Sequence, residues 1–180
     1  MAGRPVGLAG TGMRVTAFPL SHGSVESTAF LLRSGGDAML YLGDTGADAV
    51  EHSTRLRALW QAVAPLIRAH RLRGIVIECS YDDTHPDTQL WGHLSPRWLL
   101  RELAALQDIA HTPLRGMPVL VAHMKPSLRR GRSGCGHPRG TAQWQRHGRG
   151  LYRARTGHAA TVGPVGAGPD SPVPCPGTMA

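Results

Sequence analysis

The sequence has few aromatic residues, few cysteines and no long apolar run. Phe, Trp and Tyr make up 5% of the 180 residues, although a hydrophobic fraction of 41% is enough for a core. No apolar run approaches the ~20 residues of a membrane-spanning helix, so no membrane partner is expected. The three cysteines form no Cys-x-x-Cys pair, which favours a reducing compartment over a disulfide framework. We therefore expect a cytoplasmic protein with one domain of ordinary size.

Acidic residues and lysine are almost absent from residues 129–180. This segment has eight arginines, one aspartate and no lysine or glutamate, whereas residues 1–128 have 12 basic and 11 acidic side chains. The net charge of +8 therefore arises mainly from the C-terminal segment, and it does not indicate a nucleic-acid partner for the remainder.

The same segment has 11 glycines and 6 prolines, and too few apolar side chains to offset the loss of chain entropy on folding. We predict a disordered Gly/Arg/Pro-rich tail over residues 129–180. A second hypothesis is that the tail is an out-of-frame translation, because the apolar periodicity is lost abruptly after Leu128. Resequencing the gene tests it, and an unchanged reading frame would rule it out.

Residues 13–128 alternate between strand-like and helix-like patterns, after a Gly-rich segment, residues 1–12, that is predicted to be flexible. Strands are predicted at residues 13–19, 28–33, 38–42, 75–77 and 117–122, the second and third forming a hairpin. One helix is predicted at residues 49–73, and Pro65 is expected to kink it or split it in two. A second helix is predicted at residues 95–107, with Ser95 as its N-cap. This order predicts an α/β layered domain with a mixed sheet.

Polar side chains follow the predicted strands at their ends. Asp44 comes just after the apolar strand 38–42, where a rigid strand aims the side chain and a loop gives access. Glu78 and His123 each end an apolar strand, and His22 follows the first strand. A carboxylate beside three apolar residues is costly unless it is paired, and His93 is the expected partner of Glu78. Such a pair orients the ring and raises its pKa, as a proton donor requires.

Each candidate also has a plainer structural interpretation. Asp44 can cap the turn that follows it, and His22 and His123 can be ordinary structural histidines. Residues 44–48 also match the active-site signature of retropepsin-like aspartic proteases. That family requires a β-barrel, whereas a long helix is predicted to follow Asp48.

Five motifs, in this order, resemble the class II 3′,5′-cyclic-nucleotide phosphodiesterases of the metallo-β-lactamase superfamily. They are residues 18–23, 41–48, 77–81, 91–96 and 121–127. The resemblance covers residues 13–128. It implies an α/β fold that is a partial metallo-β-lactamase-type αββα sandwich, namely its C-terminal half.

The resemblance also implies roles for the candidate residues. Asp44 corresponds to the carboxylate that bridges two Zn²⁺ ions, and His123 to the last metal-ligand histidine. Glu78 and His93 correspond to the pair that protonates the leaving oxygen. His22 matches a family histidine near the site whose role the resemblance does not define, and we group it with the catalytic residues. The implied reaction is hydrolysis of cAMP or cGMP, a small-molecule partner, to the 5′-monophosphate.

The family's His-x-His-x-Asp-His segment does not occur in these 180 residues. In the family this segment precedes the stretch that matches His22, so we expect the chain to hold only the C-terminal part of the domain. Asp44 and His123 alone would bind zinc weakly, because four or more ligands are the norm. We therefore expect impaired turnover. The alternative is a non-catalytic remnant or interaction fragment of the same family.

Overall fold

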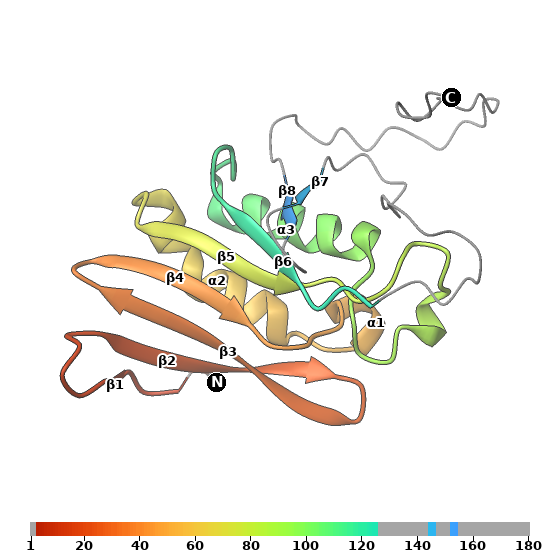
Figure 1. Cartoon of the computed structure of the whole chain (residues 1–180), viewed down its shortest axis with the longest axis horizontal. Helices are drawn as coiled ribbons and strands as arrows, with labels where there is room; N and C mark the ends of the chain where they lie inside the picture. Colours follow the sequence, from red (N-terminus) through yellow and green to blue (C-terminus); the bar gives the residue numbers. More distant parts are fainter. Residues whose placement is uncertain (1–2, 126–143, 147–151, 155–180) are drawn as a thin grey trace, which may run out of the picture.

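The computed structural model describes residues 3–125, 144–146 and 152–154, and these residues form one mixed sheet with helices on one side (Figure 1). The strands are β1 (Val6–Gly7), β2 (Arg14–His22), β3 (Val25–Ser34), β4 (Asp37–Leu42), β5 (Leu72–Glu78), β6 (Val119–Ala122), β7 (Trp144–Arg146) and β8 (Tyr152–Ala154). The α-helices are α1 (Asp48–Glu51), α2 (Arg55–Arg68) and α3 (Pro96–Ala110), and a single 3-10 turn, η1, spans Asp87–Gln89. None of the described helices is both long and apolar enough to cross a membrane.

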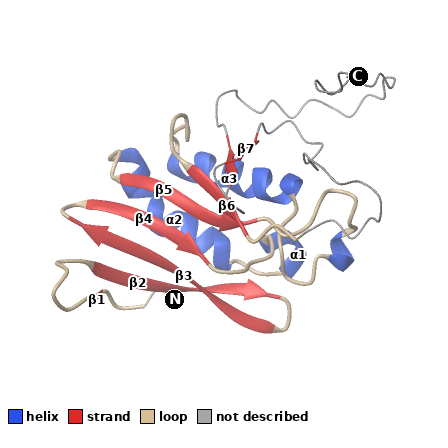
Figure 2. Ribbon diagram, in the orientation of Figure 1, coloured by secondary structure: helices blue, strands red, loops and turns tan. Residues whose placement is uncertain are grey.

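Helices α2 and α3 lie on the same face of the sheet (Figure 2). Their apolar residues recur at 3.6-residue spacing, so each helix turns one stripe of side chains to the strands. Alternate residues of the strands face the helices, and the two sets together form the core. Its most buried large side chains include Leu20, Leu40, Leu59, Trp60, Ile75 and Leu106. The predicted α/β fold is confirmed, as one sheet layer and one helix layer.

The direction of the strands brings four chain segments to one edge of the sheet. Strands β1 to β4 pair antiparallel in sequence order, and β4, β5 and β6 pair parallel. The carboxyl ends of β4, β5 and β6 therefore lie at the same edge. Strand β2 points the same way as β4, because two antiparallel steps separate them, so its carboxyl end lies there too. Ligands of such sheets usually bind at this edge.

The helix predicted at residues 49–73 is two helices, and they separate at His52 rather than at Pro65. His52 adopts a left-handed conformation with φ 49° and ends α1, whereas α2 continues through Pro65 to Arg68. The helix predicted to extend to residue 73 ends earlier, at Arg68, and β5 begins at Leu72. Gly74 lies inside β5, because the buried Leu72 already pairs with Ala38 of β4.

The two ends of the described chain also differ from expectation. Residues 1–12 were predicted to be flexible, yet Val6 and Gly7 form β1 and pair with Val15 and Arg14 of β2. Strands β7 and β8 lie within the predicted disordered tail and extend the sheet beyond β6. An edge strand offers unpaired N–H and C=O groups to any adjacent segment, so pairing there needs no apolar side chain. The rest of the predicted tail lies outside the described residues.

The face of the sheet opposite the helices is apolar and open. We call it the open sheet face and define it by Val15, Phe30, Leu32, Met39, Tyr41 and Val76. Phe30 and Tyr41 are cross-strand partners that remain 39% and 48% exposed. Large contiguous apolar patches of this kind mark surfaces that associate with another layer. The other half of the αββα sandwich implied by the family resemblance would cover such a face.

We expect the purified chain to self-associate through the open sheet face. Replacing Phe30 and Tyr41 together with Thr should shift the chain toward the monomer, since Thr suits strands but removes most of the exposed apolar surface. Light scattering coupled to size exclusion measures the change. Val6→Thr, on the equally exposed β1, is the control and should leave the association unchanged. A wild-type chain that is monomeric and melts cooperatively would contradict this expectation.

Glu102 is a buried carboxylate on α3. Its carboxylate accepts hydrogen bonds from Trp60 Nε1 at 2.9 Å and from the Asp48 N–H at 3.2 Å. Burial nevertheless raises the pKa of Glu102, and these hydrogen bonds only partly oppose it. The folded state then binds the proton more tightly than the unfolded state. The free energy of unfolding should therefore fall as the pH rises from about 4.5, the ordinary value, through the folded-state pKa.

Glu102→Gln tests this directly. The amide oxygen can still accept from Trp60 but the side chain no longer ionises, so the variant should lack this pH dependence. The amide nitrogen cannot accept from the Asp48 N–H, so the variant should lose the stability of that one hydrogen bond at every pH. Urea unfolding between pH 4 and pH 8 measures both chains. A stability difference between them that stays constant across this range would show that Glu102 does not titrate as described.

Candidate active site

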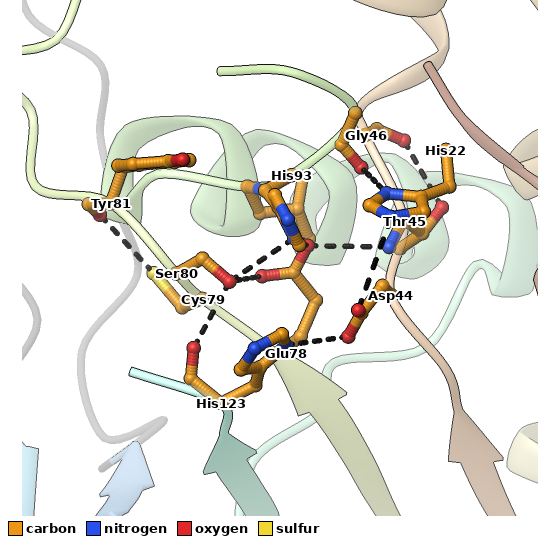
Figure 3. A network of polar contacts seen from close by, with 12 residues as sticks. His22, Asp44, Thr45, Gly46, Glu78, Cys79, Ser80, Tyr81, His93 and His123 are labelled. Atoms are coloured by element: carbon orange, nitrogen blue, oxygen red, sulfur yellow. Dashed lines mark hydrogen bonds and ion pairs between the residues drawn. The ribbon is translucent and has the colours of Figure 1, made fainter. Parts of the chain in front are cut away.

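Five polar side chains meet at the edge where the strands end (Figure 3). His22 is the last residue of β2 and Glu78 the last of β5, while Asp44 follows β4 and His123 follows β6. His93 comes from the loop between β5 and α3. The ring centroid of His93 lies 4.6 Å from that of His22 and 5.3 Å from that of His123. The structure thus brings together all five residues that the sequence singled out.

Glu78 is the buried anchor of this cluster. Its side chain is only 2% exposed, and it accepts hydrogen bonds from three groups besides a histidine. The donors are the Thr45 N–H at 3.2 Å, the Leu94 N–H at 3.1 Å and the Ser80 hydroxyl at 2.9 Å. These bonds compensate the loss of water, which would otherwise be costly for a carboxylate. Glu78 also ties the loop after β4 to the loop before α3.

The predicted pair of Glu78 and His93 is present. His93 Nδ1 lies 3.0 Å from Glu78 Oε1 and 3.1 Å from Ser80 Oγ, and the ring is 7% exposed. Because an ionised carboxylate only accepts, Nδ1 carries the proton in this contact. The second ring nitrogen, Nε2, is then the atom left for chemistry. Glu78 therefore sets both the orientation and the tautomer of His93.

Ser80 is a member of the site that the sequence reasoning missed. Its buried hydroxyl contacts Glu78 and His93, and it lies 3.0 Å from the carbonyl oxygen of His123. It therefore joins the ends of β5 and β6 to the loop that carries His93. Its place two residues after Glu78, inside one of the five motifs, was the available signal. A serine beside a carboxylate is too common a pattern to be singled out by sequence alone.

Asp44 and His123 form the exposed side of the cluster. His123 Nδ1 lies 2.6 Å from Asp44 Oδ1, and Asp44 Oδ2 lies 4.0 Å from His22 Nε2. His123 adopts a left-handed backbone conformation with φ 54°, which is uncommon for a residue with a side chain. Asp44 thus stands between two imidazole rings at the solvent-facing side of the buried Glu78–His93 pair.

His22 is held by the backbone of the loop that carries His93. Its Nδ1 donates to the Gly92 carbonyl oxygen at 2.9 Å, which leaves Nε2 without a proton in the neutral ring. Gly92 has φ +82°, and a Cβ there would lie 2.2 Å from the Gly23 nitrogen. Only glycine allows this close approach of the two backbones, so Gly92 is a positioning residue that sequence reasoning did not identify.

The donor set fits one divalent cation. One atom each from His22, Asp44 and His93 lie within 4.8 Å of one another. Two imidazoles and one carboxylate are a usual set for a catalytic zinc ion, whose fourth position is open. His22 and His93 each donate a hydrogen bond from Nδ1 to an oxygen acceptor, as is common in metal-bound histidines. Asp44 and His123, the predicted metal pair, contact each other directly, and the described residues provide no second complete set of ligands.

Cys79 lies beside Glu78 but takes no part in the site. Burial raises the pKa of its thiol, and the negative charge of Glu78 acts in the same direction. Its side chain packs in the core instead. A thiol kept protonated and away from solvent is neither a nucleophile nor a metal ligand.

Comparisons with known proteins support the family resemblance that the five sequence motifs indicate. The sequence model of the class-II cAMP phosphodiesterases matches residues 8–141. The 3′,5′-cyclic-nucleotide phosphodiesterase of Aliivibrio fischeri is 43% identical over 124 residues, which are 68% of this chain and 38% of that protein. The probable 3′,5′-cyclic-nucleotide phosphodiesterase of Yersinia pestis is 40% identical over 116 residues, which are 63% of this chain and 34% of that protein.

A solved structure agrees with the fold described above. The crystal structure of unliganded yeast PDE1 superposes with a TM-score of 0.64 and 30% identity, covering 69% of this chain and 38% of that chain. This chain therefore spans less than two fifths of the length of the relatives it matches.

The aspartic-protease interpretation of residues 44–48 is wrong. Asp44 follows a strand of an open α/β sheet, and the chain continues into α1 and α2 rather than into a β-barrel. The family model covers most of the chain, and the structure brings one described residue from each of the five motifs to one edge of the sheet, namely His22, Asp44, Glu78, His93 and His123. The chain belongs to the class-II cAMP phosphodiesterase family.

Proposed function

We propose that this protein contributes to the hydrolysis of 3′,5′-cyclic nucleotides, cAMP or cGMP, to their 5′-monophosphates. The observation that carries the proposal is the buried Glu78–His93 pair beside the half-buried Asp44. In this proposal His93 is the proton donor, and it lies next to a carboxylate with two imidazole neighbours. The relatives from Aliivibrio fischeri and Yersinia pestis are described as cyclic-nucleotide phosphodiesterases.

His93 would protonate the leaving group. Hydrolysis to the 5′-monophosphate adds a hydroxyl to phosphorus and breaks its bond to the 3′ oxygen. That oxygen leaves with negative charge and takes the proton from Nε2 of a protonated His93. Glu78 stabilises the protonated ring, since it accepts from Nδ1 at 3.0 Å in a site nearly closed to water. General acid catalysis of this kind contributes roughly 10²- to 10⁴-fold to a rate.

Asp44, His22 and His123 would hold the metal, which we propose is zinc. When bound, zinc activates water and neutralises charge that develops on the phosphoryl oxygens. His22 suits this role because Gly92 fixes its ring with Nε2 unprotonated. His93 also lies within reach of the same point, but it cannot bind the ion and donate the proton at the same time. We therefore assign His93 to the proton.

The second candidate function is a non-catalytic one, and the sequence supports it. The 180 residues contain no His-x-His-x-Asp-His segment, and the described residues provide donors for one ion only. A chain of this kind would bind a cyclic nucleotide or a partner without turning it over. The two candidates differ in one observable, the appearance of 5′-monophosphate.

The deciding experiment measures metal content and cAMP turnover on the purified chain with added Zn²⁺. We expect at most one zinc ion per chain. The turnover number for 5′-AMP formation should lie far below roughly 1 s⁻¹, the low end for typical enzymes. EDTA and His93→Ala should each abolish that turnover. Product formation that persists in both cases would overturn the proposed chemistry. Bound cAMP without any product would instead favour the non-catalytic function.

A further inference from the structure

Trp91 is an exposed aromatic side chain next to the site. It is 61% exposed and precedes Gly92, the residue that contacts His22. Its backbone has φ +44°, which is a strained conformation for a bulky residue. Strain of this size persists only where the surroundings impose it, and it is concentrated at functional positions. An exposed indole in strained backbone is not explained by packing of the core.

The backbone next to Trp91 is locked to the site. Gly92 lies so close to His22 and Gly23 that no side chain fits between them, and His22 Nδ1 donates to the Gly92 carbonyl oxygen. His93 follows at once, held by Glu78. The position of Trp91 is therefore defined relative to both His22 and His93. A ligand bound at these histidines meets Trp91 in a fixed place.

An aromatic row connects Trp91 with His93. The ring of Tyr81 lies 5.6 Å from the ring of Trp91 and 5.7 Å from the ring of His93, measured between centroids. Lys125 Nζ donates to the Tyr81 hydroxyl at 2.9 Å, which holds Tyr81. Tyr81 thus supports the indole from one side, and Trp91 is the solvent-exposed end of the row. The remaining surface of the indole is available to a flat ligand.

We propose that Trp91 is the base-stacking surface of the site, on which the purine of a bound nucleotide lies while its phosphate faces Asp44 and His93. This inference rests on the proposed function, since it assumes that a nucleotide phosphate binds at the histidines. A nucleotide carries its base one ribose away from the phosphate, and an exposed indole beside the phosphate site meets that requirement. Stacking uses the π-face that every base has, so it does not distinguish adenine from guanine. Trp91 should therefore contribute equally to the binding of cAMP and cGMP.

The test compares a ligand that has a base with one that lacks it. Binding of 5′-AMP and of ribose 5-phosphate to the zinc-supplemented full chain is measured by calorimetry, because neither ligand is hydrolysed. Trp91→Ala should weaken 5′-AMP binding about 10-fold, within the range of base–aromatic stacking, and leave ribose 5-phosphate unchanged. Trp91→Phe keeps a ring and should stay within about 3-fold of the wild type. Trp91→Ala should lower the affinities for 5′-GMP and for 5′-AMP by the same factor.

Phe30→Ala is the matched control, since Phe30 is an exposed aromatic residue on the open sheet face. It should change neither affinity. Equal losses for 5′-AMP and ribose 5-phosphate in Trp91→Ala would overturn the stacking role, because they would mean that the loop with His93 has moved. Unchanged 5′-AMP binding would overturn it as well, while leaving the proposed function intact. A wild-type chain that binds neither ligand would refute both.

Discussion

Replacing Asp44 with Asn is expected to lower the affinity of the chain for zinc by more than about 100-fold, beyond the usual effect of losing a supporting residue around a metal. Asp44 lies between His123, at 2.6 Å, and His22, at 4.0 Å, and it is the one carboxylate among the three proposed metal ligands. Asn keeps the shape but removes the negative charge that offsets the ion. Two neutral imidazoles hold zinc weakly by comparison.

Zinc affinity is measured by competition with a chromophoric chelator, so the result does not depend on turnover. Asp108→Asn is the matched control, because Asp108 is an exposed aspartate on α3 outside the cluster. It should leave the affinity unchanged. If Asp44→Asn binds zinc as tightly as the wild type, then Asp44 is not a metal ligand. The plainer interpretation, in which it caps the turn after β4, would then stand.

Replacing Glu78 with Ala is expected to cost about 3–5 kcal/mol of stability, the usual effect of breaking a buried, hydrogen-bonded charge arrangement. The Thr45 and Leu94 N–H groups both donate to Glu78, and His93 and Ser80 contact it as well. Each buried donor left without an acceptor costs roughly 1–3 kcal/mol. A loss of this size is a large part of the stability of an ordinary domain.

Urea unfolding measures this loss, with two variants for comparison. Glu26→Gln, an exposed carboxylate that pairs with Arg55, should cost less than about 1 kcal/mol. Glu78→Gln keeps an oxygen acceptor and should lose less stability than Glu78→Ala. It should nevertheless impair proton donation, since a neutral amide does not stabilise a protonated His93. An Ala variant as stable as the wild type would mean that water replaces the carboxylate, and that the loops after β4 and before α3 do not depend on it.

Much of the site was predictable because its residues end strands. An apolar run followed by a polar side chain identified Asp44, Glu78 and His123, and parallel strands bring such ends to one edge. The pairing of Glu78 with His93 followed from the cost of burying a lone carboxylate. Five short motifs in a constant order were enough to indicate the family. Each of these inferences depends on local pattern or on one strong energetic rule.

Features that depend on two distant segments were not predictable. The contact of Gly92 with His22 and Gly23 joins residues about seventy positions apart, and nothing in either loop alone indicates it. The same holds for the contact of the Ser80 hydroxyl with the His123 carbonyl oxygen, which joins residues 43 positions apart. The break between α1 and α2 at His52 was missed as well, although residues 51–55 between the two apolar segments are all polar.

The sequence by itself determined the α/β class and the family, and it singled out the five candidate residues that meet in the structure, because strand periodicity, strand ends and motifs are local properties. Only the tertiary structure decided which nitrogen of His22 and His93 faces the site, since that depends on where Gly92 and Glu78 place their oxygens. It also decided that one sheet face stays open, because a side chain of the sheet is buried only where a second layer packs against it. Tautomer, orientation and exposure are set by neighbours in space, and these neighbours come from loops and strands far apart in the chain.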